Sequence, residues 1–159
     1  MELSVCKITL FNSQRNLPLS LIRVKKAVLF LLENLKISTD EVIIHFVTES
    51  KIRMLHKEYF NDPTSTDCIT FPIDPPNNKQ STFHTLGEAF ICPKTAINYA
   101  KSHEINSYEE LYRYISHCLL HLIGYDDLKP TERAKMKKKE KDCLKHLYLA
   151  KHLPYTSSI

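Results

Sequence analysis

The segment HCLLHLIGYDD, residues 117–127, decides how the central helix of this chain ends and which side chains it carries. His117 and His121 are four positions apart, so in a helix both imidazoles lie on one face, about one turn from each other. Gly124 then ends the helix, because glycine adopts a left-handed turn without steric cost. The chain can turn back and bring Asp127 toward the histidines. Two imidazoles, a carboxylate and a vacant fourth position are typical of a catalytic zinc site.

The rest of the chain alternates between strand and helix patterns. Apolar residues in alternation or in short runs predict strands at 5–11, 42–48, 68–73 and 87–92. Apolar residues at helical spacing predict helices at 21–36, 50–59, 93–103, 107–123 and 130–149. We therefore predict one α+β domain over residues 1–153, with a mixed sheet of about four strands, about five helices and a zincin-like metal helix. Residues 154–159 are predicted to form a flexible tail.

Two local signals refine this outline. Ser107 and Glu110 have the S-x-x-E spacing of a capping box, which predicts the start of the histidine helix. Pro72 lies near the end of a predicted strand, and proline cannot donate a ladder hydrogen bond, so this strand is expected at a sheet edge.

Composition limits the class of protein. The chain has 159 residues, of which 43% are hydrophobic and 25% charged, as in an ordinary globular domain. The net charge of +4 is a mild bias toward polyanionic partners. Five cysteines without a C-x-x-C pair favour neither a disulfide framework nor a cysteine zinc knuckle. The longest apolar runs are too short to cross a bilayer, and the first residues lack a signal-peptide layout, so we expect a cytoplasmic protein without membrane contact.

A metal site of this kind predicts hydrolysis, because zinc acidifies its bound water and polarises a carbonyl or phosphoryl oxygen. Zinc peptidases place a glutamate base directly after the first histidine, and this chain has Cys118 there. A phosphodiester is the better substrate, since the basic surface attracts a polyanion. The basic run RAKMKKKEK, residues 133–141, is either a solvated helix face or a nucleic-acid surface.

The same segment resembles the H-G-x-L-H-L-x-G-Y-D-H signature of the YbeY family, and further motifs follow the family's order. These are LHKEYF (55–60), TDCITFP (66–72), LGEAFI (86–91) and Met136 with Glu140. The resemblance implies a zinc-dependent endoribonuclease specific for single-stranded RNA, which acts in 3′-end maturation of small-subunit rRNA and in ribosome quality control. It implies one Zn²⁺ per chain, and RNA and the ribosome or its small subunit as partners, with no role for DNA.

The chain departs from the family at three positions. Asp127 stands where the family has a third histidine, so the site is less positive and its water less acidified. The neighbouring Asp126 is the alternative ligand, or it holds a ligand imidazole in place. Phe60 replaces an arginine linked to RNA handling; either Arg53, on nearly the same helix face, substitutes for it or Phe60 stacks on an unpaired base. Glu88 replaces an aspartate.

The sequence thus predicts a metal-dependent endoribonuclease. The predicted metal ligands are His117, His121 and Asp127, and the candidates for a catalytic role beside a metal-bound water are Asp126, Glu88 and Arg53. Whether that water is the nucleophile or the base for an RNA hydroxyl stays open. The lysine-rich last helix and residues 61–67 are the expected surfaces for RNA or the ribosome. Two alternatives remain: a ribosome-associated RNA-binding protein whose metal is structural or absent, and a zinc peptidase.

Overall fold

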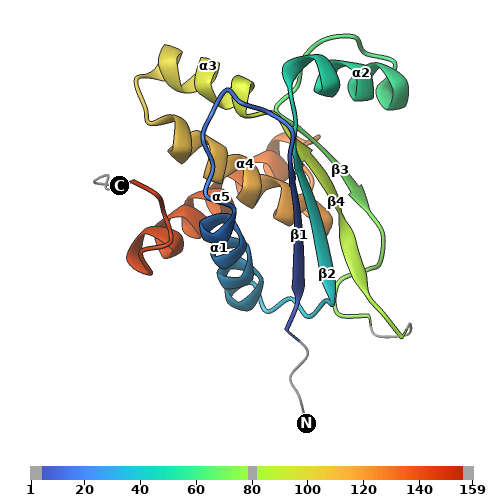
Figure 1. Cartoon of the computed structure of the whole chain (residues 1–159). Helices are drawn as coiled ribbons and strands as arrows, with labels where there is room; N and C mark the ends of the chain where they lie inside the picture. Colours follow the sequence, from blue (N-terminus) through green and yellow to red (C-terminus); the bar gives the residue numbers. More distant parts are fainter. Residues whose placement is uncertain (1–4, 79–81, 156–159) are drawn as a thin grey trace.

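The computed structural model describes residues 5–78 and 82–155. Within them the elements are β1 (Lys7–Asn12), α1 (Leu21–Asn34), β2 (Glu41–Phe46), α2 (Glu49–Phe60), β3 (Cys68–Pro72), β4 (Thr85–Ile91), α3 (Pro93–His103), α4 (Ser107–Leu122) and α5 (Pro130–Leu149). The predicted α+β class is confirmed, with five helices and a mixed four-stranded sheet (Figure 1). None of the described helices has both the length and the apolar character needed to cross a membrane.

The strands lie in the order β1-β2-β4-β3. β1 pairs with β2 and β2 with β4 in parallel, whereas β3 pairs with β4 in antiparallel orientation. The parallel pairs require crossover connections, which α1 provides between the first two strands. β3 is an edge strand and Pro72 is its last residue, as its missing donor predicts.

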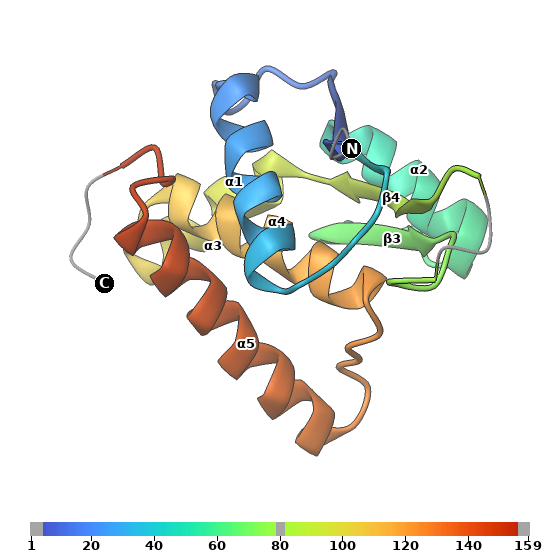
Figure 2. The ribbon, with the colours of Figure 1, turned by 90° about the horizontal axis from the view of Figure 1, so that it is seen from below.

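The two faces of the sheet are covered by different helices. Figures 1 and 2 show α1, α4 and α5 together on one side of the strands, where the large core lies. From the sheet this core includes Ile44, Phe46, Ala89 and Ile91, all fully buried. On the other face α2 packs over β3. There Ile52 and Leu55 of α2 form a smaller core with Val47, Ile69 and Cys92. The direction of each strand side chain therefore decides whether it can approach α4.

Gly87 in β4 allows α4 to lie close against the sheet. A Cβ atom at this position would be 2.4 Å from Leu122 Cδ2 and 2.7 Å from the carbonyl oxygen of Phe71. Both separations are below van der Waals contact, so only glycine fits here without displacement of a neighbour. The last turn of α4, which carries His121, is thereby held directly on β4.

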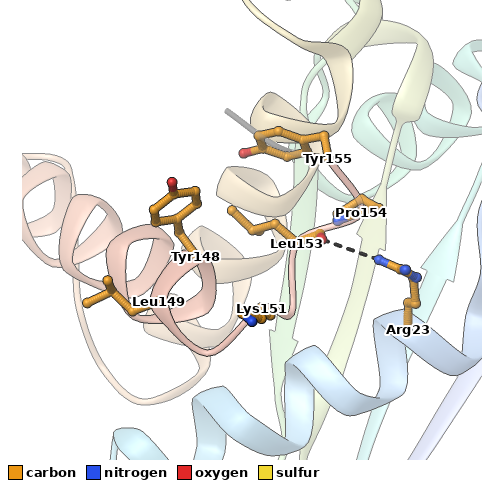
Figure 3. Close-up of a pocket in the computed structure, with 7 residues that line it drawn as sticks. All are labelled: Arg23, Tyr148, Leu149, Lys151, Leu153, Pro154 and Tyr155. Atoms are coloured by element: carbon orange, nitrogen blue, oxygen red, sulfur yellow. Dashed lines mark hydrogen bonds between the residues drawn. The ribbon is translucent and has the colours of Figure 1, made fainter. Parts of the chain in front are cut away.

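The segment after α5 folds back toward α1. Leu153 is buried in the large core, and Tyr155 is half-buried against it. Arg23 Nη1 donates to the carbonyl oxygen of Leu153 at 3.3 Å, beside a hollow of about 840 Å³ between α1 and residues 148–155 (Figure 3). Residues 154 and 155 of the predicted tail thus line this hollow, and residues 156–159 lie outside the described part of the chain.

Candidate metal centre

His117 and His121 lie in the last turns of α4 and point to the same place. Their Nε2 atoms are 3.0 Å apart, and their rings are nearly perpendicular, with centroids 4.5 Å from each other. The helix ends at Leu122, and Gly124 adopts φ +105°. The amide of Tyr125 then donates to the carbonyl oxygen of Leu120 at 3.0 Å, which turns the chain back as predicted.

This turn brings Asp127 to the histidines. Its Oδ2 atom lies 3.6 Å from Nε2 of each imidazole, and the three donor atoms lie within 4.8 Å of one another. The side chains of His117, His121 and Asp127 are 14%, 23% and 38% exposed, so solvent reaches the cluster from the Asp127 side. The structure thus brings together all three residues predicted as ligands, in an arrangement compatible with a metal ion.

The second nitrogen of each imidazole has an acceptor of its own. Nδ1 of His117 lies against Oε1 of Glu140 in α5, and Nδ1 of His121 lies 3.0 Å from the carbonyl oxygen of Tyr125. In neutral imidazoles both contacts require Nδ1 to carry the proton, since an ionised carboxylate and a carbonyl can only accept. Nε2 then presents its lone pair to the cluster in both rings, which is the tautomer that a metal needs.

The cluster therefore favours a positive charge at its centre. Two acceptor nitrogens 3.0 Å apart and a carboxylate oxygen repel one another unless a proton or a cation lies between them. Burial lowers the pKa of His117, but its hydrogen bond to Glu140 and the nearby carboxylates of Glu140, Asp67 and Asp127 raise it more, so the net shift is upward. Two imidazoles and one carboxylate are a donor set that suits zinc better than calcium or magnesium.

Glu140 belongs to this site, although the sequence predicts no catalytic or ligand role for it. It is 3% exposed and also accepts from Arg113 Nη1 at 3.2 Å, while Arg113 pairs with Glu110. Burial raises the pKa of Glu140, but His117 and Arg113 lower it more, so the carboxyl group stays ionised. The place of Glu140 in the M-x-x-x-E motif is one signal for this residue, but the motif does not link it to a histidine 23 residues earlier.

The predicted capping box is wrong. The N-cap of α4 is Asn106, whose side chain accepts from the amide of Tyr108 at 2.8 Å. Glu110 is 1% exposed and faces Arg113 beneath the metal centre. The ion pair of Glu110 with Arg113 is stronger than the hydrogen bond that Glu110 would make to an exposed amide at the start of the helix. The ion pair therefore forms in place of the capping box.

Asp126 and Glu88 do not have the expected positions. Asp126 Oδ1 accepts from the amides of Asp127 at 2.7 Å and Leu128 at 3.2 Å, so it fixes the turn. Since both imidazoles have other partners, the prediction that Asp126 holds one of them is wrong. Glu88 points to the sheet face opposite α4, where Oε1 lies 2.5 Å from His45 Nε2. It is therefore not part of the cluster.

The two candidates on α2 have other neighbours. Arg53 Nη2 donates to Glu49 Oε1 at 2.8 Å in an exposed pair one turn apart. Phe60 is 56% exposed, and its ring lies 5.7 Å from that of His56. Whether either residue substitutes for the arginine of the family stays a prediction.

Comparisons with known proteins give the family. The model of the endoribonuclease YbeY family matches residues 10–148. Relatives named endoribonuclease YbeY include proteins of Protochlamydia amoebophila (46% identity, 86% of this chain and 89% of the relative), Chlamydia felis (45%, 87% and 89%) and Chlamydia trachomatis serovar D (37%, 96% and 93%). The solution structure of a Thermotoga maritima protein has the same fold, with a TM-score of 0.64 and 21% identity over 91% of both chains. The chain belongs to the YbeY endoribonuclease family.

Proposed function

We propose that this protein is a metal-dependent endoribonuclease that cleaves single-stranded RNA, and that His117, His121 and Asp127 hold one zinc ion per chain. The observation that carries the proposal is the convergence of their three donor atoms within 4.8 Å, with both imidazoles turned Nε2-inward by acceptors on Nδ1. The names of the relatives support RNA as the substrate, since each is called an endoribonuclease.

The residues of the chain hold the ion and orient its ligands, while the ion would supply the reactivity. Zinc with three protein ligands and a vacant position acidifies water and stabilises negative charge on a phosphoryl oxygen. Glu140 fixes the ring of His117 and, as an anion, makes Nε2 a better donor. Asp127 contributes a negative charge, so the loaded site is one unit less positive than one with three histidines. The half-exposed side of the cluster leaves room for a phosphodiester.

The biological role proposed with this activity is that of the family: maturation of the 3′ end of small-subunit rRNA and quality control of ribosomes, in the cytoplasm. RNA and the ribosome or its small subunit are the proposed partners. The peptidase alternative has less support, because Cys118 takes the place of the general base and is fully buried in the large core.

The test is metal analysis of the untagged protein together with cleavage of a single-stranded RNA and of a duplex of the same sequence. We expect one zinc ion per chain and cleavage of the single strand alone. Asp127→Ala and His121→Ala should lose both zinc and cleavage, whereas His103→Ala, a histidine at the end of α3, should keep both. Zinc content and cleavage that survive in Asp127→Ala would refute the ligand assignment. RNA binding without cleavage in the zinc-loaded protein would favour the binding-protein alternative.

A further inference from the structure

Tyr125 lies between two adjoining hollows beside the metal centre. One, of about 280 Å³, is lined by Ile123, Gly124, Tyr125, Asp126, Glu132 and Lys135. The other, of about 230 Å³, is lined by Tyr125, Lys135, Lys138, Lys139 and Asp142. Because Tyr125 and Lys135 line both, the two hollows form one depression between the α4–α5 connection and the first half of α5, which we name the Tyr125 groove (Figure 2 shows the connection and the helix).

Both walls of the Tyr125 groove are attached to the metal centre. On one wall, the carbonyl oxygen of Tyr125 accepts from His121 Nδ1 at 3.0 Å. On the other wall, Lys139 directly precedes Glu140, which holds His117. The groove is therefore built on the same two segments that hold the histidines in place.

The two ends of the groove differ in charge. Lys135, Lys138 and Lys139 recur at helical spacing on one side of α5, against the single carboxylate of Asp142. Within the described part of the chain, none of these three ammonium groups has an ion-pair or hydrogen-bond partner. The other end carries the carboxylates of Asp126 and Glu132, with Lys135 shared between the two ends. Phosphates are attracted to the lysine end and repelled from the acidic end, which can instead accept hydrogen bonds from 2′-hydroxyl or base amino groups.

We propose that the Tyr125 groove binds a segment of single-stranded RNA next to the cleavage site, with an unpaired base stacked on Tyr125 and phosphates at Lys135, Lys138 and Lys139. The identity of this ligand rests on the proposed function. An aromatic ring flanked by unpaired ammonium groups is the combination that single-stranded nucleic acids require, because bases stack on the ring while cations follow the backbone. If the lysines served only to keep the helix face in contact with water, neither the groove nor the ring of Tyr125 beside them would be expected.

The chain offers a matched control on the same helix. Lys137, Lys141 and Lys145 are exposed on α5 and line neither hollow. The variant Lys135→Gln/Lys138→Gln/Lys139→Gln and the variant Lys137→Gln/Lys141→Gln/Lys145→Gln lose the same number of positive charges. A difference between them therefore reports the position of the charges, and not the net charge.

The experiment measures the affinity of a short unstructured RNA for the metal-free protein over a range of salt concentrations. Each phosphate contact contributes about 0.7 to the slope of log affinity against log salt for a single strand, so the groove variant should lose about 2 from this slope. The control variant should lose little. Tyr125→Leu should weaken binding by about 5- to 160-fold, whereas Tyr125→Phe should keep most of it, since stacking needs only the ring.

Equal loss of affinity and slope in the two triple variants would overturn the proposal, as would wild-type affinity in Tyr125→Leu. Normal binding of the RNA by the groove variant, together with lost binding to the small ribosomal subunit, would assign the surface to another partner and also overturn it. Because binding is measured without metal, these results are independent of cleavage. A protein that binds RNA through the groove and never cleaves it with zinc supplied would refute the proposed function alone.

Discussion

Replacement of Glu140 by glutamine should weaken zinc binding while leaving the fold in place. Glutamine has nearly the same size as glutamate and can still accept from His117 Nδ1 through its carbonyl oxygen. It removes the negative charge that makes Nε2 of His117 a better metal donor. Its amide group can also donate to Nδ1, which favours the tautomer with the proton on Nε2. That tautomer has no lone pair to offer the ion.

The magnitude follows from the contacts of Glu140. Loss of such a partner typically lowers metal affinity by about 10- to 100-fold, which corresponds to about 1.4–2.7 kcal/mol of binding free energy. The cost to the metal-free fold should be about 1.5–3 kcal/mol, the value of a hydrogen bond to a charged group. It should not exceed this range, because Arg113 keeps its pair with Glu110 and no buried charge is left alone.

The assay is competition between the protein and a chelator of known zinc affinity at constant pH. Glu132→Gln, a change of the same kind in the first turn of α5, is the control, since Glu132 is not among the residues that contact the histidines. Thermal unfolding of both metal-free variants checks that they fold. Zinc affinity equal to that of the wild type in a folded Glu140→Gln protein would refute the view that Glu140 orients His117.

Three further predictions concern neighbouring features. Gly87→Ala should lower the free energy of unfolding by about 1–3 kcal/mol in a denaturant titration, because the added Cβ overlaps Leu122 and a backbone oxygen that cannot move aside. Asp127→His should keep one zinc ion but shift the pH profile of RNA cleavage to lower pH, because the site becomes one unit more positive; an unchanged profile would contradict this. In the metal-free protein the pKa of His117 is raised and that of Glu140 lowered, so their pair stabilises fully between about pH 4.3 and 6.5, the ordinary pKa values of the two groups. Stability should fall as the pH rises above this window, through the pKa of His117, and as the pH drops below it, through the pKa of Glu140. In Glu140→Gln the fall at low pH should be absent and the fall at high pH smaller, because Asp67 and Asp127 also raise the pKa of His117.

The features that the sequence predicts well are those set by short stretches of chain. The two imidazoles share a helix face, Gly124 ends the helix, and Asp127 follows three residues later, so local geometry alone brings the ligands together. The strands and helices are predicted equally well from the sequence, because each type of element has its own period of apolar residues. Local geometry does not say which face of a strand is covered by which helix. Glu88 is a candidate only because it stands where the YbeY family has an aspartate, and its side chain points to His45 on the other face.

The charged contacts beside the site cannot be predicted from one segment, because they form only when three helices pack together. Arg113 joins Glu110 of its own helix to Glu140 of α5, and its guanidinium lies over the ring of Tyr99 in α3, 5.7 Å from the centroid. A single chain segment cannot specify such an arrangement, because its energy appears only when all the partners are desolvated together. The same reason explains the failed capping box at Ser107, where a local rule competed with a buried ion pair.

One signal in the sequence nevertheless pointed to Glu140. The last helix has buried residues Met136, Cys143, Leu144 and Leu147 on one side, and Glu140 lies among them, within an apolar stripe of a helix rich in lysine. A carboxylate at such a position is costly unless it has a charged partner, so its presence predicts a buried cation or a hydrogen-bonded imidazole nearby. Both are found, as Arg113 and His117. The acidic residue that interrupts the apolar stripe of α5 is therefore the residue that connects this helix to His117.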